Sequence, residues 1–141
     1  MVSCMENSKI RHLEMIQGVI NRMAGNSFKL KGWAVTLVAG IFALASRDTD
    51  KLYFLIAYIP IVIFWGLDSY YLLQERLFRS LYNKVRLLDE NDIDFSMKAT
   101  KKEFSDEKNR FCSCLFSKTE IWFYLPLAVV CAGIILITNI I

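Results

Sequence analysis

Histidine is nearly absent from this 141-residue sequence, and the glycines, prolines and cysteines number only six, two and four. The single histidine, His12, excludes any metal site that needs two histidines from one subunit. A single residue separates Cys112 from Cys114, but no second pair and no nearby histidine completes a metal-binding pattern. We therefore expect no metal site and interpret the four cysteines as free thiols.

Catalytic motifs are also lacking. The sequence has no glycine-rich phosphate loop, no nucleophile elbow and no zinc motif. His12 lies near Glu14 on a predicted amphipathic helix, where such a pair is more typical of a surface than of a site. The apolar segments leave little chain for a soluble core, so a complete enzyme domain does not fit. We predict that the protein is not an enzyme and uses no cofactor.

Apolar residues, in contrast, make up 55% of the chain, more than in an ordinary soluble domain. They gather in three blocks, at residues 30–46, 52–73 and 119–138. The stretch from Leu52 to Leu67 carries no charge and would extend about 24 Å as a helix, close to the thickness of a bilayer core. The sequence therefore predicts an all-α integral membrane protein, a single membrane domain over 1–141 with three transmembrane helices.

Helical periodicity continues outside the apolar blocks. Residues 7–28 predict an amphipathic helix, which either packs on the extension of the second span or lies in the headgroup plane. Residues 23–32 join this helix to the first span and either bend the chain or continue the helix. Residues 74–88 extend the second span into the cytosol with apolar side chains three and four positions apart. This apolar stripe needs a partner from the same chain or from a second copy.

Residues 89–118 form a third kind of segment, in which charges of both signs surround sparse apolar side chains. We predict a cytosolic segment with one or two short helices. Such a charge run is typical of a solvated surface. The alternative is recognition of a small ligand or of a partner protein.

The distribution of basic residues predicts the topology. Ten of the 17 lysines and arginines lie between Arg76 and Lys118, whereas the short loop 46–51 has two that Asp48 and Asp50 balance. Positive charge is retained on the cytosolic side of membrane proteins. The N-terminus and the 74–118 region are therefore expected in the cytosol, and loop 46–51 and the C-terminus outside.

Several residues at the ends of the spans have predicted roles in anchoring or packing. Basic and aromatic side chains typical of membrane-interface anchors are Lys29, Lys31, Trp33, Lys118 and Trp122. Small residues at every fourth position, which permit close helix contact within or between subunits, are Gly32, Thr36 and Gly40.

Asp68 is the most notable polar residue of the second span, because Trp65, Tyr70 and Tyr71 surround it in the sequence. An acidic group in a span is a functional candidate. It either forms a structural ion pair with Lys29, Lys31 or a base of a neighbouring subunit, or lines or gates a pore. Basic residues that follow, and that could contact headgroups, a nucleotide or a protein, are Arg76, Arg79 and Arg86.

Two stretches, HLEMIQGVINRMAGNSFKLKGWAVTLVAG and FWGLDSYYLLQERLFRSLYNKVR, resemble segments that recur in small bacterial membrane proteins. The overall plan of residues 12–86 resembles the SLATT-type transmembrane effectors of antiphage defence systems. The resemblance rests on layout rather than on a diagnostic motif. It implies oligomerisation and damage to the inner membrane when a partner senses infection, and it carries no catalytic residues across.

These observations lead to two hypotheses. The first is a bacterial inner-membrane effector, multi-pass with a cytoplasmic N-terminus and a periplasmic C-terminus, that homo-oligomerises and permeabilises or depolarises the membrane in abortive infection. The second is a membrane anchor or regulatory subunit that recruits a soluble partner through its cytosolic helices. The expected partners are membrane lipids, further copies of the chain, and a soluble sensor protein or a signalling nucleotide. A net charge of +3 is too small to indicate nucleic-acid binding.

Overall fold

The computed structural model describes residues 2–45 and 55–140, and side chains within 7–44 and 55–137. Its elements, in chain order, are α1 (Val2–Ala45), α3 (Tyr58–Leu87), η1 (Glu90–Asp92), η2 (Glu107–Asn109), α4 (Phe111–Leu115) and α5 (Lys118–Ile140). The described residues form no strand, which confirms the all-α prediction. The predicted external loop 46–51 and the start of the second predicted span lie outside the described residues.

Helix α1 is a single helix of 44 residues, about 66 Å long, which covers both the predicted amphipathic helix and the described part of the first predicted span. It begins at Val2 rather than near residue 7, and residues 23–32 continue it without a break. The reason is tertiary: α1 packs along α3 over much of its length, which outweighs the weak helix propensity of Gly25, Asn26 and Ser27. The alternative in which residues 7–28 lie apart in a headgroup plane is therefore wrong.

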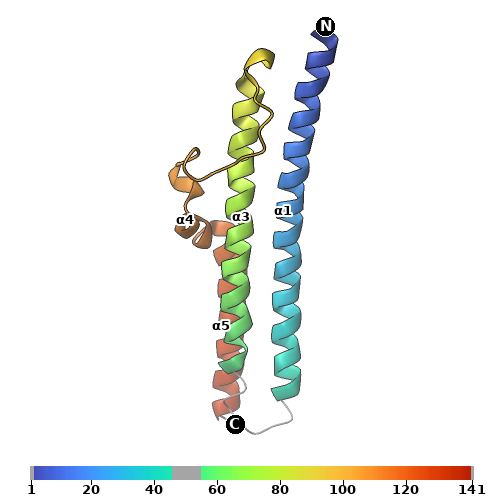
Figure 1. The fold of residues 1–141 in the computed structure, drawn as a ribbon. Coiled ribbons are helices and arrows are strands. Elements are labelled where there is room, and N and C mark those ends of the chain that lie inside the picture. Colours follow the sequence, from blue (N-terminus) through green and yellow to red (C-terminus); the bar gives the residue numbers. More distant parts are fainter. Residues whose placement is uncertain (1, 46–54, 141) are drawn as a thin grey trace.

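The three long helices are arranged as an unequal antiparallel bundle (Figure 1). Helix α3 returns along α1, and α5 lies beside only that half of α3 that is nearer its beginning. The chain's C-terminal end lies at the same end of the molecule as the end of α1, and the N-terminus lies at the other. One half of the molecule thus has three helices, and the other has two with the segment 88–117 folded against them.

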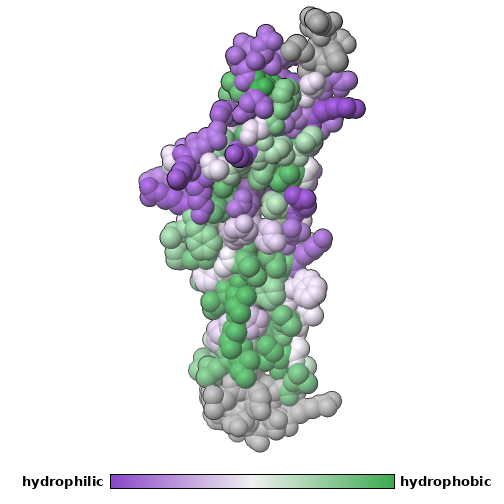
Figure 2. All heavy atoms as spheres, in the orientation of Figure 1, coloured by the Kyte–Doolittle hydropathy of each residue, from purple (hydrophilic) through white to green (hydrophobic). Residues whose placement is uncertain are grey.

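Polarity divides the molecule in the same way. Figure 2 shows hydrophilic residues gathered over the two-helix half and hydrophobic residues over the three-helix half. Helices α1 and α5 contain stretches long and apolar enough to cross a membrane, within Asn7–Leu44 and Lys118–Ile137. Large apolar side chains face outward there, including Leu44, Val62 and Trp122, which are 65% to 78% exposed. These features are compatible with a membrane location.

The apolar stripe of residues 74–88 finds its partner within the chain. Leu73, Leu77, Leu81 and Val85 are all buried. Ile16 and Ile20 of α1 pack with the last two of these and with Ile93 in one cluster, and Cys114 of α4 packs with the first two in another. The stripe therefore does not require a second copy of the protein.

Polar contacts fix the segment 88–117 against the helices. The Lys9 ammonium donates a hydrogen bond of 2.6 Å to the carbonyl of Leu88, at the end of α3. The side-chain amide of Asn109 donates to Ser80 Oγ and to the Phe104 carbonyl. Since Asn109 is 5% exposed, these contacts attach the segment to the helices, while most of its charged side chains are exposed.

Candidate functional site

Where α5 begins, the three long helices place charged side chains at one level. The group consists of Lys31 on α1, Asp68 on α3, and Glu120 and Tyr124 on α5, and we call it the clasp. Asp68, Glu120 and Tyr124 are each at most 1% exposed, and the Lys31 side chain is 15% exposed. The clasp therefore lies inside the protein, at the end of the three-helix half where α5 begins.

The start of α5 positions Glu120 for this role. Ser117 precedes the helix, its carbonyl accepts from the amide of Ile121 at 3.0 Å, and its hydroxyl accepts from the amide of Glu120 at 3.4 Å. Ser-x-x-Glu is the capping-box pattern, in which the glutamate side chain usually returns to the cap residue. Here the Glu120 carboxylate instead faces Lys31. The first turn of a helix also favours a negative charge, because amide dipoles point towards it.

The Lys31 ammonium is the centre of the clasp. It forms an ion pair with Asp68 Oδ2, lies 3.1 Å from Glu120 Oε1, and donates to Ser27 Oγ at 3.1 Å. The hydroxyl of Tyr124 donates to the same Asp68 oxygen at 3.2 Å. One lysine thus joins all three helices, and its three donors each have an acceptor.

The charges of the clasp do not balance. Two carboxylates face one ammonium, so the group has a net charge of −1 when all three are ionised. Asp68 Oδ1 and Glu120 Oε2 are buried and have no hydrogen-bond partner among the described residues. Buried charges that lack partners are costly, since they lose hydration without full compensation. The two ion pairs of Lys31 therefore hold the clasp together, and a displacement of Lys31 would destabilise it.

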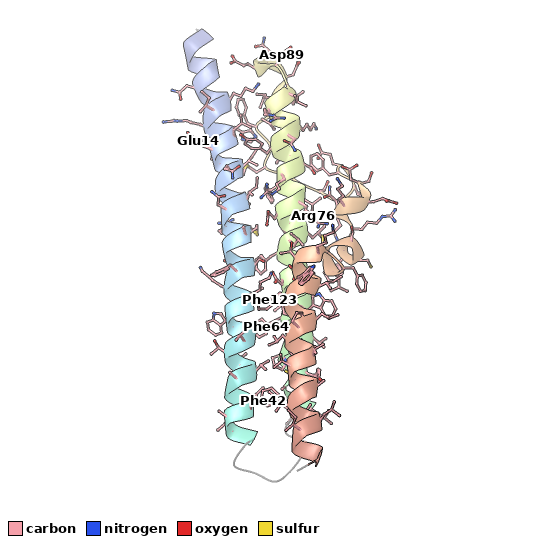
Figure 3. The ribbon with its side chains drawn as sticks, turned by 180° about the vertical axis from the view of Figure 1, so that it is seen from behind. Glu14, Phe42, Phe64, Arg76, Asp89 and Phe123 are labelled. Carbon is pink, nitrogen blue, oxygen red and sulfur yellow. The ribbon has the colours of Figure 1, made fainter. Side chains whose placement is uncertain are left out.

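Aromatic rings enclose the clasp. The ring of Trp65 stacks on that of Tyr124 with centroids 6.1 Å apart, and its indole N–H donates to the Leu115 carbonyl at 3.0 Å. The Lys31 ammonium lies 5.8 Å from the centre of the Phe123 ring. Figure 3 shows Phe123 and Phe64 between α1 and the α3–α5 pair. These rings reduce contact with water and so strengthen the electrostatic interactions inside.

From the clasp towards the C-terminal end of α5, the interior of the three-helix half is apolar. Ala34, Val38, Ile61 and Cys131 are buried there, each at most 4% exposed. No group of three or more potential metal ligands occurs in the described part of the chain. The arrangement can fix the register of three helices.

Two residues of the clasp, Asp68 and Lys31, are predicted site residues, and the position of Lys31 differs from the predicted one. Asp68 pairs with Lys31, which is one of the ion-pair partners that the sequence suggested. Lys31 was predicted as a membrane-interface anchor, but its ammonium turns inward because two buried carboxylates attract it more strongly than the surface does. Lys29, two positions earlier, is exposed. The pore or gating role of Asp68 stays a prediction.

The other predicted interface and packing residues lie at the surface. Lys29, Trp33, Lys118 and Trp122 are exposed, with Trp33 at 65%. The small-residue row of Gly32, Thr36 and Gly40 faces away from the bundle, whereas Ala34 and Val38 face inward. A Cβ atom built at Gly32 or Gly40 would meet nothing within 4 Å. Of the two contacts that the row suggested, the contact within the subunit is therefore not formed by any residue that the structure describes.

The three arginines predicted to interact with partners have different environments. Arg76 Nη1 donates to the Lys108 carbonyl at 2.7 Å, and Arg79 pairs with Glu75 one helical turn away at 2.8 Å. Arg86 is exposed. Arg76 therefore serves the packing of the chain's own segment, and a role of these arginines in partner binding stays a prediction.

Sequence reasoning missed Glu120 and Tyr124. Two signals could have identified Glu120: the Ser-x-x-Glu pattern at residues 117–120, and a carboxylate at the start of an apolar helix, at the same expected depth as Asp68. Tyr124 follows one helical turn after Glu120 and so lies on the same face.

Comparison of the chain with protein-family models, with curated proteins and with solved structures finds no match.

Proposed function

We propose that the protein is an inner-membrane effector of bacterial antiphage defence, which homo-oligomerises and permeabilises or depolarises the membrane. In this proposal the chain crosses the membrane three times, with α1, α3 and α5 as spans, the two-helix half in the cytosol and the C-terminus in the periplasm. The observation that carries the proposal is the clasp, because charged side chains inside apolar helices mark ion pathways or gating elements.

The clasp supports a resting state that is closed. Lys31 neutralises part of the negative charge of Asp68 and Glu120, and the interior below them is apolar. The described residues of a single subunit thus form no polar path through this interior, so permeation would run between subunits. The outward row of Gly32, Thr36 and Gly40 is the surface that we assign to contact between copies.

The long helices support a mechanism for opening. Helices α1 and α3 continue without interruption from the cytosolic end to the clasp. A soluble partner or a small ligand that shifts one of them relative to the other would move Lys31 away from Asp68. The two carboxylates would then require water or cations, which favours a hydrated path at the inner edge of the membrane.

Membrane potential measured in cells tests this proposal. Wild-type protein should depolarise the membrane when triggered, and Asp68→Asn should abolish depolarisation while its amount and its oligomer size on native gels stay normal. Asp106→Asn, an exposed carboxylate outside the clasp, is the matched control and should behave as wild type. Normal depolarisation by Asp68→Asn would contradict the proposal.

The apolar interior favours a second candidate function, a membrane anchor or regulatory subunit that recruits a soluble partner through the two-helix half. In that case Lys31, Asp68 and Glu120 only hold the helices together. Asp68→Asn would then reduce the amount of folded protein, and wild-type protein would leave the membrane potential unchanged.

A further inference from the structure

A second polar site lies near the N-terminal end of α1, far along the helix from the clasp. An open cavity of about 360 Å³ lies where α1 meets the segment after α3. Its lining residues are Ser8, Arg11, His12, Met15 and Phe95. Neither the clasp nor the proposed permeabilisation uses this cavity.

His12 is the first unusual feature of the cavity. The sequence suggested a surface histidine, yet His12 is 3% exposed. Its Nε2 atom is buried and has no hydrogen-bond partner among the described residues. Buried polar groups in proteins are nearly always hydrogen-bonded, so an imidazole nitrogen without a partner is an unusual feature beside this cavity.

Phe95 is the second unusual feature. Its φ angle is 53°, and it is the only described residue other than glycine with a positive value. Most residues with a Cβ atom disfavour this region, whereas glycine adopts it freely and asparagine adopts it more readily than other residues. The ring contacts His12 edge to face, with centroids 5.5 Å apart, and is still 48% exposed. Strained backbone conformations of this kind are concentrated at functional sites such as ligand-binding positions, where the surrounding structure holds them in place.

The remaining lining residues indicate the chemistry of the ligand. Arg11 supplies a permanent positive charge with planar donors that suit a carboxylate or a phosphate. Met15, 57% exposed, and the Phe95 ring supply an apolar surface on which a flat ring can lie. The volume of the cavity is within the range of small-molecule sites, although the cavity is open rather than enclosed.

We infer that this cavity binds a small anion that carries a planar ring, with the ring against Phe95 and Met15 and the anionic group at Arg11, beside His12. The inference does not depend on the proposed membrane activity. A ligand seated here would contact α1 and the segment 88–117 at once. Its binding would therefore add a further link between two elements that packing and the Lys9–Leu88 hydrogen bond already hold together.

Calorimetry on the full chain in phosphatidylcholine nanodiscs tests the inference, with AMP as the probe. Adenosine presents the ring without the charge, and inorganic phosphate presents the charge without the ring. We expect AMP to bind at least about tenfold more tightly than either. Phosphate binding as tight as that of AMP, or no detectable AMP binding, would overturn the inference.

Two variants separate ligand binding from folding. Phe95→Asn should keep or raise the thermal midpoint, because asparagine accepts a positive φ, yet it should weaken AMP binding at least about tenfold. Arg11→Gln should weaken AMP binding to the level of adenosine, whereas Arg22→Gln, an exposed arginine on the same helix outside the cavity, should not change it. Wild-type affinity in Phe95→Asn or Arg11→Gln would overturn the inference, whatever the thermal midpoint.

Discussion

Lys31 and Glu120 lie 89 positions apart in the sequence, and their Nζ and Oε1 atoms are 3.1 Å apart in the structure. Because the same ammonium also pairs with Asp68, one side chain connects α1, α3 and α5. No other described ion pair links helices in this half of the molecule. The stability of the three-helix half should therefore depend strongly on this lysine.

Replacing Lys31 with methionine keeps an unbranched side chain that is one atom shorter and removes its charge. Asp68 and Glu120 would then be buried without a counter-charge, which typically costs about 3 to 5 kcal/mol of unfolding free energy. Unfolding titrations with SDS in mixed micelles measure the change. Lys29→Met is the matched control and should alter the free energy by less than about 0.5 kcal/mol, since Lys29 is exposed. Equal effects of the two substitutions would contradict the assignment of the clasp.

Two tyrosines provide a comparison of charged and neutral acceptors. Tyr124 donates to the Asp68 carboxylate and Tyr58 to the Ala128 carbonyl, both at 3.2 Å. Tyr124→Phe should reduce the unfolding free energy by about 1.5 to 3 kcal/mol, and Tyr58→Phe by about 0.5 to 1.5 kcal/mol. The same micelle titration compares them. The reverse order would show that the Asp68 carboxylate does not depend on the Tyr124 hydroxyl.

Topology is predicted from the asymmetry of basic residues. An alkaline-phosphatase fusion after Ile141 should be active, because the enzyme folds only outside the cytosol, and a fusion after Asn91 should be inactive. Green fluorescent protein at the same two positions is the control and should give the opposite pattern. An active phosphatase after Asn91 would reverse the orientation that we propose.

Helix α1 has an inward alanine, Ala34, and an outward row of small residues, Gly32, Thr36 and Gly40, and the two should respond differently to added bulk. Ala34 is fully buried, so Ala34→Leu should overpack the bundle and reduce the unfolding free energy by about 1 to 3 kcal/mol. Gly40→Leu should leave that free energy nearly unchanged and should lower the oligomer population in native mass spectra. A stable wild-type monomer in mild detergent would count against assembly through this row.

The two cysteines of α4 should differ in reactivity. Burial raises the pKa of the Cys114 thiol, and the charge of Glu120 adds to the effect, although Arg76 opposes it. A raised pKa means less thiolate at a given pH, so Cys114 should react slowly with N-ethylmaleimide at pH 7.5 and faster as the pH rises past 9. Cys112, which is exposed, should react first. Mass spectrometry of labelled peptides measures both, and equal rates at pH 7.5 would contradict the buried position of Cys114.

The sequence by itself determined the properties that depend on neighbours along the chain. Apolar periodicity at three and four positions placed Leu73, Leu77, Leu81 and Val85 on one buried face of α3, as the structure confirms. The density of apolar residues predicted helices long enough to cross a membrane, and two such helices are present. The isolation of Asp68 among aromatic residues marked it as a group that needs a partner.

Only the tertiary structure decided which face of each helix meets which neighbour. Lys29 and Lys31 are about 200° apart around α1, so the rotation of the helix selects Lys31 for Asp68 and leaves Lys29 outside. The same rotation turns Gly40 outward and buries His12. Periodicity fixes the relative positions of residues on one helix, but the orientation of that helix follows from the packing of residues far apart in the chain.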